Sequence, residues 1–207
     1  MPALPSAVGN AGRYTTIAMI LHWIVALGIL TLLGIGLIMK HGGLPPQRMF
    51  QLFQLHKSIG ITVLFAVILR LIWRLTHAAP ALPATMPRIE RKTAHAGHIA
   101  LYALMLGLPL LGWGVVSASA FSIPTVLFGE IPWPDLPVLP NMDHKDVAEG
   151  ILTALHKYGA WLMIALLAAH IGAVLRHRFI LHDGVAGRMI FLPRFSKTPH
   201  SPSVRKA

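Results

Sequence analysis

Four histidines lie within apolar stretches of this chain, at positions that would bring them together as two pairs. They are His22, His56, His156 and His170. An ionisable side chain inside a membrane-spanning segment is costly and usually marks a functional site. Imidazole is also the commonest metal ligand that proteins offer. Two such pairs on facing helices therefore predict two metal centres, stacked across a bilayer.

The elements that would position these histidines are four long apolar segments. The chain has 207 residues, 55% of them hydrophobic, and a mean hydropathy of +0.63, which is too apolar for an ordinary soluble domain. A helix needs about 20 apolar residues to cross roughly 30 Å of hydrocarbon. We therefore expect an all-α membrane protein, a single four-transmembrane-helix bundle over residues 1–207. Its predicted spans are 17–39, 55–75, 97–117 and 158–175.

The first of these segments is expected to stay in the mature protein. Its apolar run is too long for the core of a signal peptide, and no small-residue cleavage site follows it. The segment also carries His22, one of the four candidate ligands.

The net charge of +11 is unevenly distributed along the chain. If four spans alternate, one face carries Arg13, Arg70, Arg74, Arg88, Arg91, Lys92, Arg176, Arg178, Arg188, Arg194, Lys197, Arg205 and Lys206. The opposite face carries Lys40, Arg48, Lys57, Lys145 and Lys157 together with Glu130, Asp135, Asp143, Asp146 and Glu149. By the positive-inside rule, both termini are then cytoplasmic. The basic excess reflects topology and attraction to anionic membrane lipid, so we expect no nucleic-acid partner.

Depth and helical periodicity pair the four histidines. His22 is near the start of an outward-running span, so it lies toward the cytoplasm, whereas His56 and His156 open inward-running spans and lie toward the outer face. His170 follows His156 by 14 residues, which is about 21 Å deeper and within about 40° of the same helix face. The expected pairs are His22 with His170, and His56 with His156.

The residue types favour haem over other metal centres. The chain has no cysteine, which excludes disulfides, iron–sulfur clusters, zinc-thiolate sites and covalently attached haem. Two imidazoles without carboxylates make a poor zinc or di-iron site, whereas a porphyrin supplies four nitrogens itself and needs only two axial ligands. A lone intramembrane histidine could instead bridge helices by a hydrogen bond, but two matched pairs weaken that alternative. Small residues expected to admit a macrocycle are Gly28, Gly60, Gly159 and Gly172.

The motifs around these histidines resemble those of the prokaryotic cytochrome b561 family, four-helix di-haem proteins of the bacterial inner membrane. The resemblance spans roughly residues 13 to 194. Its carriers are Leu21-His22-Trp23, His56-Lys57-Ser58-Ile59-Gly60, Ala94-His95-Ala96-Gly97-His98, His156-Lys157, Ala169-His170 and Arg176-His177.

The resemblance implies two non-covalent b haems, with His22, His56, His156 and His170 as axial ligands. It also implies single-electron transfer between an outer-face donor and membrane quinone. Characterised relatives either pass electrons to or from quinone or oxidise superoxide at the outer face while reducing ubiquinone, and related cytochromes anchor hydrogenases. The chain is therefore expected to be a superoxide:ubiquinone oxidoreductase or an electron carrier with a periplasmic redox partner.

Cationic side chains beside the predicted ligands suggest further roles. Lys57 and Lys157 each follow an outer ligand directly, so they could bind haem propionates or attract a small anion such as superoxide. Snorkelling to the interface is an equal alternative for both. Arg70 is a candidate partner for the propionates of the inner haem, whereas Arg74 is better explained as a positive-inside anchor.

Three further histidines are expected near the cytoplasmic side. His95 and His98 are predicted to hydrogen-bond haem carboxylates or a quinone carbonyl, supporting the site without ligating iron. His177 lies seven residues beyond His170, on nearly the same helix face. We regard it as the candidate proton donor to quinone, because imidazole can exchange a proton near neutral pH.

Two other functions remain open from the sequence. The proline-rich loop 118–150 is longer than a minimal turn, so it is expected to be an ordered cap or a docking surface. In the second case the chain would be the cytochrome b subunit of a larger redox complex. The third possibility, a histidine-lined metal transporter, is disfavoured because the predicted spans contain no Asp or Glu.

Overall fold

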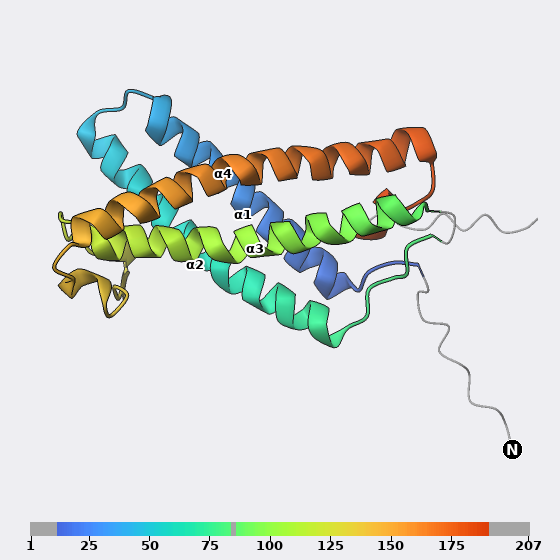
Figure 1. The fold of residues 1–207 in the computed structure, drawn as a ribbon, viewed down its shortest axis with the longest axis horizontal. Coiled ribbons are helices and arrows are strands. Elements are labelled where there is room, and N and C mark those ends of the chain that lie inside the picture. Colours follow the sequence, from blue (N-terminus) through green and yellow to red (C-terminus); the bar gives the residue numbers. More distant parts are fainter. Residues whose placement is uncertain (1–11, 84–85, 191–207) are drawn as a thin grey trace, which may run out of the picture.

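Four long helices run up and down along one another in the computed structural model, which describes residues 12–83 and 86–190 (Figure 1). They are α1 Thr16–His41, α2 Pro46–Thr76, α3 Arg88–Ala118 and α4 Lys145–Arg176. All four are long and apolar enough to cross a membrane. The predicted bundle of four apolar helices is confirmed. Arg194, Lys197, Arg205 and Lys206, which entered the topology argument, lie outside the described residues.

The start of α1 and the end of α4 lie at the same end of the bundle, which we call the inner end (Figure 1). Thr15 caps α1, since its hydroxyl accepts the Ala18 N–H at 3.2 Å. Pro46 occupies the first turn of α2, where a missing N–H costs nothing. The helices are longer than the apolar runs, most of all α4, which begins at Lys145 and not near residue 158. Each helix therefore extends beyond the apolar segment that would cross the hydrocarbon core of a membrane.

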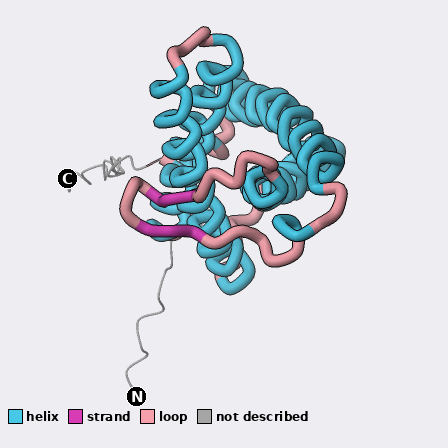
Figure 2. The backbone as a smooth tube through the Cα atoms, turned by 90° about the vertical axis from the view of Figure 1, so that its left-hand side faces the viewer, coloured by secondary structure: helices cyan, strands magenta, loops and turns pink. Residues whose placement is uncertain are grey.

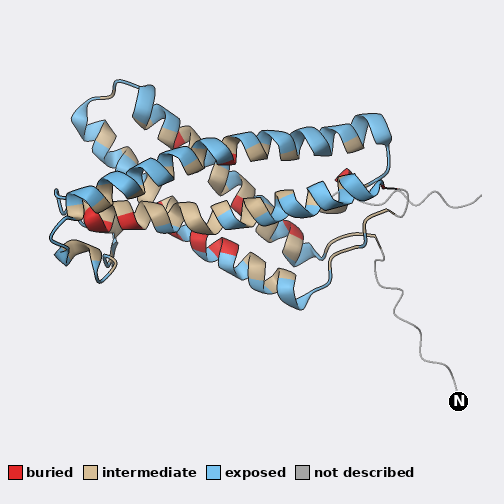
Figure 3. Cartoon of the chain, viewed as in Figure 1, coloured by how far each residue is buried: buried red, intermediate tan, exposed pale blue. Residues whose placement is uncertain are grey.

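Each helix packs mainly on its neighbour in sequence, so α4 rests on α3 and makes few or no close backbone contacts with α1 and α2. The core cluster lies between α1 and α2 and consists of Val25, Val63, Ala66 and Val67. Buried positions are few along the bundle, and most of the outward surface is exposed (Figure 3). An apolar exposed surface is what a helix bundle presents to lipid.

Residues 119–144 form an outer cap that lies across the end of the bundle opposite to the inner end (Figure 2). It contains the antiparallel strands β1 Thr125–Leu127 and β2 Ile131–Trp133 and the short helix η1 Leu139–Asn141. Ser58 of α2 accepts the Phe128 N–H at 2.9 Å. The outer cap is thus ordered and bonded to the helices, as the sequence predicted.

The chain turns back across the inner end after α4. A π-helical turn, η2 His177–Leu181, leads into the short helix η3 Ala186–Met189. The Trp23 indole N–H donates to the Met189 carbonyl at 3.0 Å, and the Arg188 guanidinium donates to the Ala81 carbonyl at 2.6 Å. These bonds tie the segment after α4 to α1 and to the loop between α2 and α3.

Candidate functional site

The rings of His56 and His156 face each other near the outer end, from α2 and α4. Their centroids are 6.2 Å apart and their planes are inclined by 69°. A metal–imidazole bond is about 2 Å long, so two rings on opposite faces of one metal have centroids roughly 6 Å apart. The separation fits a flat metallocofactor held between the two rings.

One hydrogen bond orients the His156 ring toward this gap. Its Nδ1 lies 3.0 Å from the Leu108 carbonyl of α3, so Nδ1–H donates and Nε2 keeps its lone pair. His56 Nδ1, in contrast, is buried and has no partner in the described part of the chain. An imidazole with one nitrogen fixed as a donor presents the other as a ligand.

A cavity of about 380 Å³ surrounds the outer pair and is lined by all four helices and the outer cap. Its size lies within the roughly 300–1,000 Å³ of small-molecule sites. Most of the lining side chains are apolar. Polar groups on the wall include Lys57, Lys157, Thr125 and Trp133. An apolar wall with cations near one end suits a macrocycle that carries carboxylates on one edge.

Two of the four glycines predicted to admit a macrocycle are instead packed against neighbouring helices. A Cβ at Gly28 would lie 2.5 Å from Val63 Cγ2, and one at Gly159 would lie 2.9 Å from Leu108 Cδ2. The prediction that these two admit a macrocycle is therefore wrong, because neighbouring helices already fill the space. Gly60 lines the cavity, and Gly172 has open space beside it. Among the described glycines, Gly112 comes closest to a candidate ligand, and the sequence analysis did not select it.

Three imidazoles meet at the inner level. The His22 and His170 rings are 6.5 Å apart at 58°, and the His98 and His170 rings are 5.9 Å apart at 63°. Each separation, taken as a pair, suits two imidazoles on opposite faces of one metal. Helix α3 packs directly on α4, whereas α1 makes few or no close backbone contacts with α4. This arrangement favours His22 as the partner of His170 and leaves His98 beside the pair.

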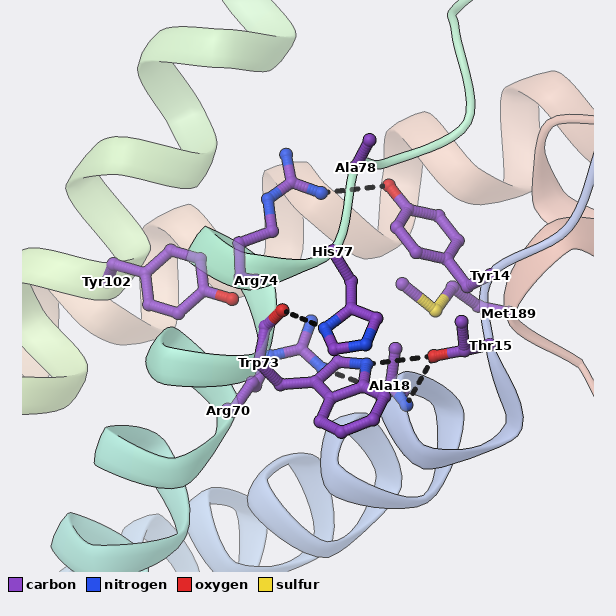
Figure 4. Close-up of a pocket in the computed structure, with 10 residues that line it drawn as sticks. All are labelled: Tyr14, Thr15, Ala18, Arg70, Trp73, Arg74, His77, Ala78, Tyr102 and Met189. Carbon is purple, nitrogen blue, oxygen red and sulfur yellow. Dashed lines mark hydrogen bonds between the residues drawn. The ribbon is translucent and has the colours of Figure 1, made fainter.

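Arg70 lies close enough to His22 and His170 for their charges to interact. Its guanidinium donates to the Ala18 carbonyl at 3.1 Å and stands over the Tyr102 ring, 5.9 Å from the centroid. It also lines a small crevice of about 30 Å³ that Arg74 borders as well (Figure 4).

Arg74 and His95, the other predicted residues near this level, make fewer contacts with the inner histidines. Arg74 donates to the Tyr14 hydroxyl at 3.4 Å. His95 is exposed, and its charge interacts with His98.

The two lysines beside the outer pair differ in their contacts. The Lys57 ammonium donates to the Pro124 carbonyl at 3.4 Å and so reaches the outer cap. Lys157 is exposed and stands over the Tyr158 ring, 5.4 Å from the centroid. Both line the outer cavity, so both could meet an anion there.

His177 is held by a carboxylate that the sequence analysis did not identify. Its Nδ1 is 2.6 Å from Asp183 Oδ2, while the Val185 N–H donates to Asp183 Oδ1 at 3.1 Å. Desolvation opposes ionisation of this carboxyl, but the bonds from Val185 and His177 outweigh it and lower the pKa of Asp183. The π-helical turn brings the two residues together, and no local sequence pattern signals such a contact.

Within residues 12–83 and 86–190, no group of three or more His, Cys, Asp or Glu side chains could hold a metal ion. A zinc or di-iron site needs more ligands than a pair of imidazoles. The paired histidines are therefore suited to a cofactor that brings most of its own donors.

A four-span bundle with paired intramembrane histidines is typical of membrane cytochromes of the b type. The sequence matches the family described as prokaryotic cytochrome b561 over residues 13–192. It is 30% identical over 179 residues to cytochrome b561 homolog 2 of Escherichia coli, covering 86% of this chain and 91% of that protein. It is 30% identical over 181 residues to cytochrome b561 homolog 1 of the same organism, covering 86% and 97%.

A further relative is a probable superoxide oxidase, CybB, of Yersinia pestis. It is 26% identical over 181 residues, covering 86% of this chain and 96% of that protein. The chain belongs to the prokaryotic cytochrome b561 family. It is accordingly a multi-pass bacterial membrane protein with a haem b-dependent role in electron transfer.

Proposed function

We propose that this chain binds two b haems and moves single electrons between a donor at the outer face and ubiquinone in the membrane. The outer haem is held by His56 and His156, the inner one by His22 and His170. The bound haems supply the one-electron chemistry, and the protein sets their spacing and access. Both termini are cytoplasmic in this proposal, and the membrane is the bacterial inner membrane.

The observation that carries this proposal is the matched geometry of two pairs at two levels. The ring centroids are 6.2 Å apart in one pair and 6.5 Å in the other. Both pairs use α4, and their partners α1 and α2 stand away from it. Interhelical hydrogen bonding alone would not explain this repetition, since neither pair is joined by a hydrogen bond among the described residues.

The favoured outer donor is superoxide. Two superoxide anions each give up one electron and leave as oxygen, while one ubiquinone takes up two electrons and two protons to become ubiquinol. Lys57 and Lys157 on the wall of the outer cavity would attract the anion locally. His177, held by Asp183 at the inner end, would donate a proton to the quinone.

Substitution of a ligand tests the haem assignment. His156→Ala should lower the haem content from two per chain to one, measured by haem extraction and by optical spectra. His41→Ala is a matched control, because His41 is exposed at the end of α1. Two haems per chain in His156→Ala would disprove the ligand assignment.

Stopped-flow spectroscopy tests the donor and the acceptor. The purified, oxidised protein is mixed with superoxide, with and without a ubiquinone analogue. Rapid reduction followed by quinone-dependent reoxidation is expected of a superoxide:ubiquinone oxidoreductase. Haem that stays oxidised with superoxide, but is reduced by quinol, would exclude superoxide as the donor.

The second candidate function is the cytochrome subunit of a larger redox complex. The outer cap exposes large apolar side chains, among them Phe121 at 83% and Val138 at 71% exposure. Exposed apolar patches on a rigid segment are typical of partner-binding surfaces. Activity of the purified chain alone would argue against this candidate, whereas copurification of one defined outer-face subunit, lost in Phe121→Ser, would favour it.

A further inference from the structure

The outer cap holds Trp133 against the wall of the outer cavity. Thr125 of β1 and Trp133 of β2 are cross-strand partners, and both line the cavity. The strand pair is fixed to α2 because the Gln54 side chain donates to the Pro124 carbonyl at 3.0 Å. The Ser58–Phe128 bond holds the turn between the strands. The indole of Trp133 therefore has little freedom to move away from the cavity.

Trp133 is packed between two aromatic rings of the bundle. Its centroid is 5.5 Å from that of Trp113 in α3 and 5.9 Å from that of Phe65 in α2. The Trp113 indole N–H donates to the Pro134 carbonyl at 2.9 Å, so its polar atom is satisfied. The Trp133 Nε1 is buried, but no acceptor for it is found in the described part of the chain.

A buried N–H donor without an acceptor is rare in native proteins, and each instance calls for a missing partner. The cavity beside Trp133 provides a place for that partner. Charge in this region is positive at Lys57 and Lys157, which line the same cavity. The missing acceptor is therefore expected to be an anion, and a carboxylate at the edge of a mainly apolar ligand fits both features.

We propose that the indole N–H of Trp133 donates a hydrogen bond to a propionate carboxylate of the outer haem. The proposal rests on the function proposed above, which places that haem in this cavity. Trp133 thereby links the outer cap to the cofactor. Lys57 contributes a second positive group on the same wall and is itself bonded to the outer cap through Pro124.

The competing explanation is an N–H···π contact with Phe65. The two rings are nearly perpendicular, at 87°, which is the geometry of an edge-to-face pair. Such a contact would satisfy the indole weakly without any ligand. The two explanations predict different effects of removing Phe65 on the potential of the outer haem.

The test compares Trp133→Phe with Phe65→Leu and Trp113→Phe in the haem-loaded protein, by potentiometric titration followed optically. Trp133→Phe leaves the propionate charge less compensated and so favours the oxidised form. We expect its equilibrium constant for reduction of the outer haem to fall two- to tenfold. At 59 mV per tenfold for one electron, that is about 20 to 60 mV lower in midpoint potential. The inner haem and both control variants should keep their potentials.

Two outcomes would overturn the inference. One is an unchanged outer-haem potential in Trp133→Phe with both haems bound. The other is an equal shift in Phe65→Leu, which would assign the N–H to the phenyl ring. Either result leaves the two-haem function standing, because the loss of haem on substitution of His56 or His156 tests that function separately.

A second measurement needs no variant. The ultraviolet resonance Raman band that reports indole N–H hydrogen bonding is compared in the haem-loaded and haem-free wild-type protein. Haem loading should shift part of the tryptophan band toward stronger hydrogen bonding. An unshifted band would count against the inference even if Trp133→Phe did not fold.

Discussion

Gly112 of α3 lies directly against the imidazole of His156. A Cβ at this position would be 3.1 Å from His156 Cε1 and 3.4 Å from Nδ1, closer than side chains normally approach. The same ring donates to the Leu108 carbonyl, one helical turn earlier on α3. Helix α3 therefore sets both the position and the tautomer of an outer ligand, although it contributes no ligand to that pair itself.

Gly112→Ala should displace the His156 ring and weaken binding of the outer haem. The added methyl group forces the imidazole to shift, and the Leu108 bond then lengthens. We expect partial loss of one haem per chain, measured by haem content and redox titration. Gly107→Ala on the same helix is the control, because a Cβ there meets nothing within 4 Å. Equal haem content in the two variants would contradict this prediction.

His22→Ala and His98→Ala should show which of these two histidines is the haem ligand opposite His170. Both rings approach His170, at 6.5 Å and 5.9 Å respectively. His22→Ala is expected to remove the inner haem, because α1 makes few or no close backbone contacts with α4 and so stands away from His170. His98→Ala should retain two haems with an altered inner potential. Loss of haem in His98→Ala with retention in His22→Ala would reverse the assignment, as read from haem content and optical spectra.

Ser58→Ala should loosen the outer cap from α2. Ser58 is fully buried, donates to the Gln54 carbonyl at 2.7 Å and accepts the Phe128 N–H at 2.9 Å. Loss of a hydrogen-bond partner costs about 1 kcal/mol when water can reach the group left behind. Hydrogen exchange across residues 124–133 should accelerate. Thr62→Ala, which removes a hydroxyl bonded only to its own helix, should leave this exchange unchanged.

Asp183→Asn should slow proton delivery to quinone. The lowered pKa of Asp183 keeps its carboxylate ionised at neutral pH, where it accepts the hydrogen bond from His177 Nδ1. In the wild type this contact persists at pH values above that pKa and is lost as the pH falls through it. We expect a roughly tenfold slower quinone reduction at neutral pH, with unchanged electron entry at the outer face.

The control for the Asp183 prediction is Glu90→Gln. Glu90 pairs at 3.1 Å with Arg176, the residue that precedes His177. Glu90→Gln therefore removes a nearby negative charge without changing a contact of the imidazole. The rates of both variants are measured by stopped flow over a range of pH. An identical pH profile for Asp183→Asn and the wild type would exclude a role for the carboxylate.

The pairing of the histidines could be predicted because helix geometry is periodic. Fourteen residues between His156 and His170 fix both their depth and their shared face, whatever surrounds them. The glycines could not be assigned in this way. Whether Gly28 meets a cofactor or Val63 depends on how α1 is rotated against α2, and sequence spacing contains no information on that rotation.

Contacts that form where the chain reverses direction also could not be predicted from the sequence. Asp183 reaches His177 only because α4 ends in a π-helical turn and the chain then folds back. Trp133 reaches the outer cavity only because β2 pairs with β1 across the end of the bundle. Each placement depends on tertiary contacts, so neither residue had a recognisable motif around it.

Helix α4 contributes one residue to each histidine pair, and this sharing restricts how its length can change. One residue inserted between His156 and His170 would rotate one ring away from the other by about 100°. If one pair stayed aligned with its partner, the histidine of the other pair would then face the wrong side of the helix. An insertion of four or seven residues turns the face by only about 40° or about 20°, but it would add about 6 Å or about 10 Å to the separation of the two levels. Within this segment, homologous proteins should therefore differ by substitution and not by insertion or deletion.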